Sequence, residues 1–174
     1  MDFKKIIIYS LFMLVNACSM KEELIISLSS SDENFMTDAS YGNLGLIHHG
    51  NAASAKTMNN DVQVFAGRIT QQSLQAQKDL IDRAGTLRFS LPAEIDSAHI
   101  LLADQLTLLR ARAYDSVYLL SQIQILNGLK ELYKHRLDSN SHGLLGRFAA
   151  MQLPEIQENL VLAEQIRSSM KIDL

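Results

Sequence analysis

The feature that most constrains the fold is a helical repeat of apolar residues between positions 61 and 84. Apolar or small residues recur there every three or four positions, which is the period of an α-helix. A helix with one such stripe has to bury it against other elements, so the repeat predicts a helical bundle. The stripe consists of Val62, Phe65, Ala66, Ile69, Ser73, Ala76, Leu80 and Ala84.

Four further segments have the pattern of helices. Helix start and stop signals place them at residues 32–56, 96–109, 113–137 and 144–170. Ser31 or Asp32 is the expected cap of the first helix. No segment shows the alternation of a strand. We therefore expect an all-α fold, a four-helix up-and-down bundle with one short extra helix.

Glycine and proline mark where these helices are expected to end or bend. Gly42, Gly45 and Gly50 weaken the first helix, so breaks or close helix contacts are expected there. Gly85 should end the second helix, and Pro154 should restart or kink the last one. The helix over 113–137 has Val117, Leu120, Ile123, Leu126 or Asn127, and Lys130 on one face, with Tyr114, Tyr118, Ile125, Leu129 and Leu132 nearby. It is apolar over much of its circumference, so it is expected to be central.

The N-terminus has the pattern of an export signal. A basic start, Lys4-Lys5, precedes ten mostly apolar residues, which is far fewer than the roughly 20 that span a bilayer as a helix. Ala17 then precedes Cys18, with Val15 two places earlier. This arrangement resembles a bacterial lipobox.

The lipobox resemblance implies cleavage between Ala17 and Cys18, followed by attachment of fatty acyl groups such as palmitate to Cys18. Two or more acyl chains anchor a protein stably to a membrane. Ser19 in place of Asp favours passage to the outer membrane, on its periplasmic or surface face. The alternative is an ordinary secretory signal followed by an incidental Cys18.

The chain accordingly divides into a signal peptide over 1–17, a tether over 18–31 and one bundle domain over 32–170. Residues 1–17 contain two Lys and one Asp, so the remaining chain has 14 basic and 18 acidic residues, a net charge of −4. That mild acidity argues against nucleic acid as a partner. With Cys18 acylated, no cysteine remains for a disulfide or a thiolate metal site.

Five short motifs occur in an order that resembles one family, the outer-membrane or periplasmic proteins called domain of unknown function 4142. The resemblance covers roughly residues 32–165 and implies a ferritin-like helical bundle. The motifs are Val62-x-x-Phe65-Ala66-x-x-Ile69, Leu91-Pro92-x-x-Ile95-Asp96-x-x-His99, Tyr114-Asp115-x-x-Tyr118, Phe148-Ala149 and Leu153-Pro154-x-x-Gln157-x-x-Leu160.

The resemblance also implies that the family's recurrent histidines are replaced in this chain. Ser73, Leu126 and Asn159 stand at the three positions where the family usually has His. The family's first-helix Glu falls near Leu46 or His48. We therefore expect these positions to have lost the family's ligand chemistry.

The remaining residues give little sign of catalysis. A ferritin-like di-metal site needs Glu-x-x-His on two helices, and this spacing is absent from the sequence. His48 and His49 are weak metal candidates, because adjacent helical residues point about 100° apart. His99 is expected simply to bury one face of its ring. Nucleotide-binding and hydrolase motifs are absent as well.

Two functions remain open at this point. The first is a non-catalytic envelope lipoprotein that needs no cofactor and binds an unknown protein partner or has a structural or stress role. The second is a metal-handling or oxidative-stress protein with altered ligands, among them His48, His49 or Glu94. A soluble secreted bundle without a lipid is a third, simpler possibility. We expect the first.

Overall fold

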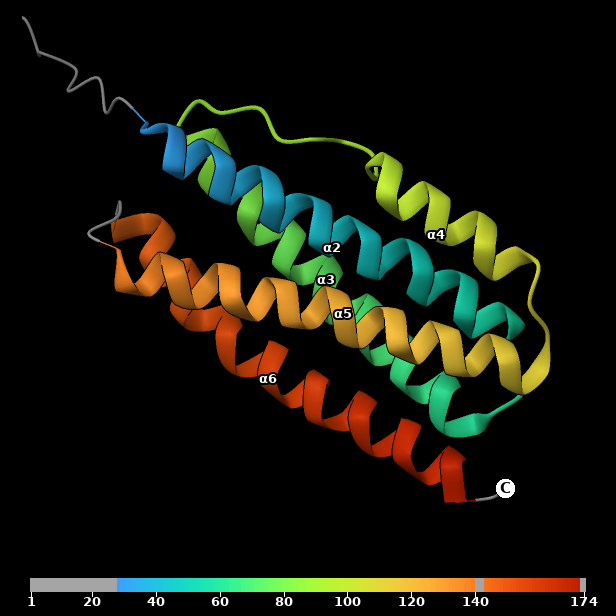
Figure 1. Ribbon diagram of the computed structural model, residues 1–174. Coiled ribbons are helices and arrows are strands. Elements are labelled where there is room, and N and C mark those ends of the chain that lie inside the picture. The colour runs from blue at the N-terminus through green and yellow to red at the C-terminus, as the bar shows by residue number, and fades with distance from the viewer. Residues whose placement is uncertain (1–27, 140–142, 173–174) are drawn as a thin grey trace, which may run out of the picture.

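The computed structural model describes residues 28–139 and 143–172, and this part of the chain is all-α. It contains five helices and no strand: α2 (Ser30–Lys56), α3 (Asn60–Thr86), α4 (Ser97–Thr107), α5 (Ala111–Asp138) and α6 (Gly143–Ile172). Figure 1 shows the four long helices side by side, with the short α4 running alongside α2. The expected helical class is confirmed.

The chain order of the bundle differs from the expected simple alternation of directions. α2 packs against α3 and α5, and α6 packs against the same two helices, so that all neighbours are antiparallel (Figure 1). α3 and α5 therefore run in the same direction. This is possible because residues 87–110, which include α4, carry the chain back along the bundle instead of turning at once.

The helix boundaries follow local capping chemistry. α2 begins earlier than expected because Ser29, not Ser31 or Asp32, is its N-cap. The Ser29 hydroxyl accepts from the Asp32 backbone N–H at 3.1 Å, and the Asp32 carboxylate accepts from the Ser29 N–H at 3.2 Å. This capping box satisfies two otherwise free helix donors. Residues 29–31 thus belong to the start of the bundle and not to the tether.

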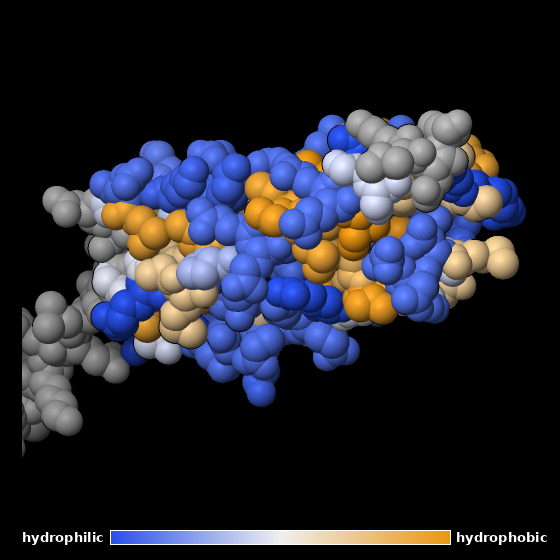
Figure 2. All heavy atoms as spheres, turned by 90° about the horizontal axis from the view of Figure 1, so that it is seen from below, coloured by the Kyte–Doolittle hydropathy of each residue, from blue (hydrophilic) through white to orange (hydrophobic). Residues whose placement is uncertain are grey.

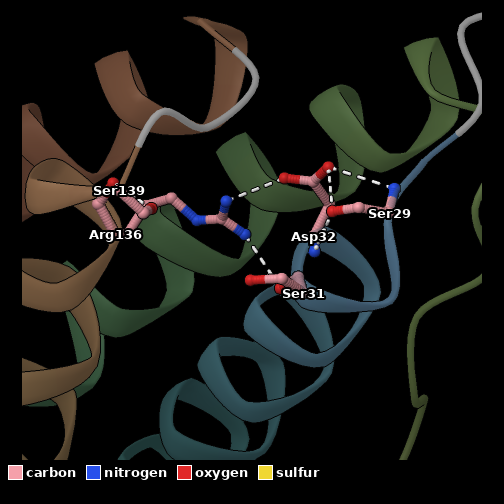
Figure 3. A network of polar contacts seen from close by, with 5 residues as sticks. All are labelled: Ser29, Ser31, Asp32, Arg136 and Ser139. Atoms are coloured by element: carbon pink, nitrogen blue, oxygen red, sulfur yellow. Dashed lines mark hydrogen bonds and ion pairs between the residues drawn. The ribbon is translucent and has the colours of Figure 1, made fainter.

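The same end of α2 is joined to the end of α5 by a buried ion pair. Arg136 Nη1 donates to Asp32 Oδ1 at 2.7 Å and Arg136 Nη2 donates to the Ser31 carbonyl at 2.9 Å (Figure 3). The guanidinium also lies 4.5 Å from the centre of the Phe35 ring. Arg136 is buried among these polar and aromatic contacts.

The stripe predicted for α3 is confirmed, since all eight of its residues are buried.

The prediction for α5 was less accurate. Leu120 is 38% exposed, whereas a row of aromatic and aliphatic residues faces inward. α5 is packed between α2 and α6, so its buried arc is set by two neighbours and is wider than one stripe. The inward residues include Tyr114, Tyr118, Leu119, Leu126, Leu129 and Tyr133.

The glycines of α2 are places of close contact and not breaks. A Cβ added at Gly42 would meet Leu129, and one added at Gly45 would meet the His99 ring. A Cβ added at Gly50 would meet the Thr70 hydroxyl and would lie 3.2 Å from the Ala66 carbonyl oxygen. Gly85 lies inside α3, which ends at Thr86, and Pro154 lies inside α6.

Some large apolar side chains remain on the outside. Figure 2 shows the molecule from below, where apolar patches are broken up by polar side chains. In α6, Met151 and Val161 are more than half exposed. Within the described residues, none of the helices has an apolar stretch long enough to cross a membrane.

Candidate functional site

The centre of the bundle contains a small polar cavity of about 20 Å³, to which all four long helices contribute. This volume is enough for about one water molecule. Its polar side chains come mainly from α3 and α6, and its apolar side chains from α2, α3, α5 and α6. The lining consists of Asn43, Leu46, Ile69, Gln72, Ser73, Ala76, Leu126, Leu129, Gln152, Glu155, Ile156 and Asn159.

Amide side chains carry the hydrogen bonds around this cavity. Asn159 Nδ2 of α6 donates to Gln72 Oε1 of α3 at 2.7 Å. Asn43 Nδ2 of α2 donates to Gln77 Oε1 of α3 at 3.4 Å, and Gln77 Nε2 donates to Ser40 Oγ at 2.8 Å. Asn159 Oδ1 is buried without a partner in the described structure. The amides thus tie three helices together through neutral groups.

Comparison with known proteins assigns the chain to a family. Residues 25–166 match the family model described as "Domain of unknown function (DUF4142)". The chain belongs to the DUF4142 family. No protein with a curated description matches the sequence.

A solved structure supports the helical fold of this DUF4142 chain. It is a DUF305 protein from Streptomyces coelicolor, described as secreted, which aligns with a TM-score of 0.70 and 14% sequence identity. The alignment covers 82% of this chain and 93% of the other. At this identity, the likeness concerns the fold alone.

The three positions at which the resemblance implies a replaced histidine meet at the cavity. Ser73 of α3, Leu126 of α5 and Asn159 of α6 all line it, although they are far apart in the sequence. Leu46 also lines it, whereas His48 is exposed on α2. Of the two positions considered for the family's first-helix Glu, the structure therefore favours Leu46.

The donors at this cavity do not fit a ferritin-like metal pair. Such a site combines carboxylates from four helices with two imidazoles. Here the lining contains one carboxylate, that of Glu155, and no imidazole. Its other polar groups are amides and one hydroxyl. Across the described residues, no cluster of three or more His, Cys, Asp or Glu side chains could hold a metal ion.

A second group of polar residues lies where α4 meets α2. The His49 side chain is completely buried, and its ring stacks on that of His99 with 5.6 Å between centroids. The His48 ring lies edge-on to the His49 ring, with 5.5 Å between centroids. His99 Nδ1 lies 2.7 Å from Asp96 Oδ1, and the same oxygen accepts from the His99 N–H at 2.9 Å.

These contacts keep His49 neutral and Asp96 ionised. Burial lowers the pKa of His49 to about 4, assisted by the neighbouring His99 and His48. Both ring nitrogens of His49 are buried without a hydrogen-bond partner in the described residues. Burial acts to raise the pKa of Asp96, but hydrogen bonds from His99 outweigh it and hold that pKa below its usual value.

The contact between His49 and His99 was not anticipated from the sequence. The sequence does predict a short helix starting near Asp96, and in the structure Asp96 is the N-cap of α4. The sequence does not reveal the partner of the ring, because that partner is set by packing of α4 on Gly45 of α2.

The remaining candidates take no part in either group. Glu94 is exposed in the connection before α4. Ala17, Cys18 and the predicted cleavage site lie outside the described residues.

Proposed function

We propose that this DUF4142 protein is a non-catalytic lipoprotein of the bacterial cell envelope. Its helical bundle would be tethered to the membrane, most simply the outer membrane, through acyl groups on Cys18. There it would bind a partner or have a structural or stress role. The apolar N-terminal run and the Ala17-Cys18 pair support the anchor, and the description of the related Streptomyces fold as secreted agrees with export.

The proposal includes a ferritin-like origin of the bundle. Ferritin-like folds have one long crossover between their helix pairs. In this chain, residues 87–110 supply one such connection between α3 and α5. This topology supports descent from a metal-binding scaffold.

The side chains that line the central cavity support the non-catalytic part of the proposal. Where the fold would place metal ligands, Ser73, Leu126 and Asn159 supply a hydroxyl, a hydrocarbon and an amide. Neutral amides hydrogen-bonded to one another tie helices together but do not replace the carboxylates and imidazoles of a di-metal centre. The chemistry of this position favours a structural role.

The anchor is tested by the variant Cys18→Ser in the full-length protein, expressed in a Gram-negative host. Membrane association and incorporation of labelled palmitate should both be lost, whereas a Ser19→Ala control should retain them. Lipid anchoring would be refuted if Cys18→Ser left the amount of protein in the membrane fraction unchanged. If the parent protein were also found outside the membrane fraction, that result would favour the soluble secreted bundle.

The non-catalytic role is tested by metal analysis of the purified protein, prepared without chelator or a metal-affinity tag. We expect no stoichiometric iron, manganese or zinc, and no rise in melting temperature when these ions are added. Tightly held ions at one or two per chain, with a raised melting temperature, would overturn the proposal.

Metal handling is the second candidate, although no cluster of three or more His, Cys, Asp or Glu side chains in the described residues could hold an ion. His48, His49 and His99 are the imidazoles brought together in the structure. Under this alternative, His99→Gln and His49→Gln would each abolish metal binding, whereas changes at Ser73 or Asn159 would leave it intact.

A further inference from the structure

A groove of about 480 Å³ lies between α2, α5 and the start of α4, on a different side of Leu129 from the central cavity. Its volume falls in the range of small-molecule sites, about 300–1,000 Å³. The lining consists of Asp38, Tyr41, Gly42, Asp96, His99, Ile125, Gly128, Leu129 and Leu132.

The wall contributed by α5 is apolar and hollow. Ile125, Leu129 and Leu132 supply hydrocarbon on this helix. Gly128 supplies no side chain, and a Cβ added there would meet nothing within 4 Å. The groove therefore has open space directly over α5, next to an apolar surface that favours an apolar ligand.

Two carboxylates and one imidazole lie beside this wall, and the imidazole of His99 is already hydrogen-bonded to Asp96 at 2.7 Å. Asp38 comes from α2 and Asp96 from the cap of α4, whereas no Lys or Arg is among the lining residues. The hydrogen bonds from His99 hold the pKa of Asp96 below its usual value, so that its carboxylate is negative at neutral pH. Tyr41 adds an aromatic ring, whose face attracts cations.

We propose that this groove binds a small organic cation, an ammonium group carried on an apolar body. The apolar part would lie over Gly128 and against Leu132, and the ammonium group would face Asp38 and Asp96. Charge complementarity selects this occupant, because Asp38 has no partner in the described residues, Asp96 adds a second negative charge beside it, and an anion would be repelled. The site is separate from the lipid anchor and from the central cavity.

The test uses three ligands with the same ring and different charge: benzylammonium, benzyl alcohol and benzoate. Each is titrated at pH 7 into the full-length protein in a mild detergent, with binding followed by saturation-transfer NMR and competition. We expect saturable binding of benzylammonium, at least fivefold weaker binding of benzyl alcohol and no detectable binding of benzoate. Equal binding of all three ligands, or no saturable binding of benzylammonium, would overturn the proposal.

Matched variants locate the site. Gly128→Leu should fill the groove and weaken benzylammonium binding at least tenfold, whereas Gly67→Leu should leave it unchanged. Gly67 is an equally open helical glycine, but it is on α3 and away from the groove. Unchanged binding to a folded Gly128→Leu protein would contradict the assignment.

A charge variant gives an independent test, because Asp38 is exposed and makes no structural hydrogen bond in the described residues. Asp38→Asn should weaken benzylammonium binding severalfold and should leave benzyl alcohol binding unchanged. The control is Asp82→Asn, an exposed aspartate of α3. The same loss in both variants would indicate general charge attraction and would refute a specific site.

Discussion

At the scale of single residues, the interior of this bundle contains several polar side chains. Ser40, Asn43, Gln77 and Asn159 are all buried. Neutral amides and hydroxyls are tolerated inside when they bond to one another, as most of these do. Charged groups are tolerated only in pairs.

The buried Arg136–Asp32 pair gives the first prediction. Arg136→Ala leaves the Asp32 carboxylate buried without its guanidinium, and breaking such a pair from one side costs about 3–5 kcal/mol of unfolding free energy. We expect a loss of this size in urea denaturation. Lys134→Ala is the control, because its pair with Glu131 is exposed and such pairs contribute little. Equal losses in the two variants would contradict the argument.

The second prediction concerns acid. The pKa of His49 is about 4 in the folded protein, below the value of about 6.5 in an unfolded chain. The unfolded state therefore binds the proton first as the pH falls. Stability is fully present above pH 6.5 and declines between pH 6.5 and 4, by about 3 kcal/mol in all.

This decline should disappear when the imidazole is removed. His49→Leu should flatten the dependence of unfolding free energy on pH between 4.5 and 7, whereas His48→Gln, at an exposed position, should retain most of it. The window avoids titration of Asp32 and Asp96, whose pKa values are lowered. If the parent protein had the same unfolding free energy at pH 4.5 and at pH 7, the pKa of His49 would not be lowered in the folded protein, and the argument would fail.

At the scale of elements, α4 is the helix held by the fewest contacts. Among its residues only Leu106 is fully buried, while Ile100 and Leu101 are about half exposed or more. Lys56 Nζ donates to the Leu106 carbonyl at 2.7 Å and to the Thr107 carbonyl at 3.0 Å. Its other end depends on the His99 ring lying against Gly45.

This dependence gives the third prediction. Gly45→Ala places a methyl group in the His99 ring, so we expect α4 to shift and the protein to lose about 1–3 kcal/mol, the usual range for overpacking. Hydrogen exchange in residues 97–107 should become faster. Gly67→Ala is the control and should gain about 0.5–1 kcal/mol, because its position is open and Ala favours helix. A gain in both variants would show that α4 does not rest on Gly45.

The elements also show which features the sequence reveals. Helix α3 could be predicted with its inward stripe, because the apolar period is a local signal. The inward face of α5 could not, because two neighbouring helices determine it. The cavity positions Ser73, Leu126 and Asn159 were found through a family motif, but their meeting in space needed the fold. The stacking of His49 on His99 had no signal in the sequence, since it joins two helices by packing alone.

At the scale of the whole molecule, the proposed tether and the bundle are separate parts that meet at Ser29. The capping box closes the start of α2 with its own residues, and Asp32 joins this end to Arg136 (Figure 3). These contacts belong to residues from Ser29 onward. The bundle should therefore fold without the segment before Leu28.

Two deletions that differ by five residues give the last prediction. A protein starting at Leu28 keeps the cap and the ion pair, so its unfolding free energy should equal that of the full chain, while its membrane association should be lost. A protein starting at Glu33 loses Ser29 and Asp32, and the missing cap and broken pair should together remove several kcal/mol. Thermal melting and membrane fractionation measure both effects. If the shorter deletion destabilises the bundle as much as the longer one, the segment before Leu28 contributes to the stability of the domain, and its assignment as a tether is excluded.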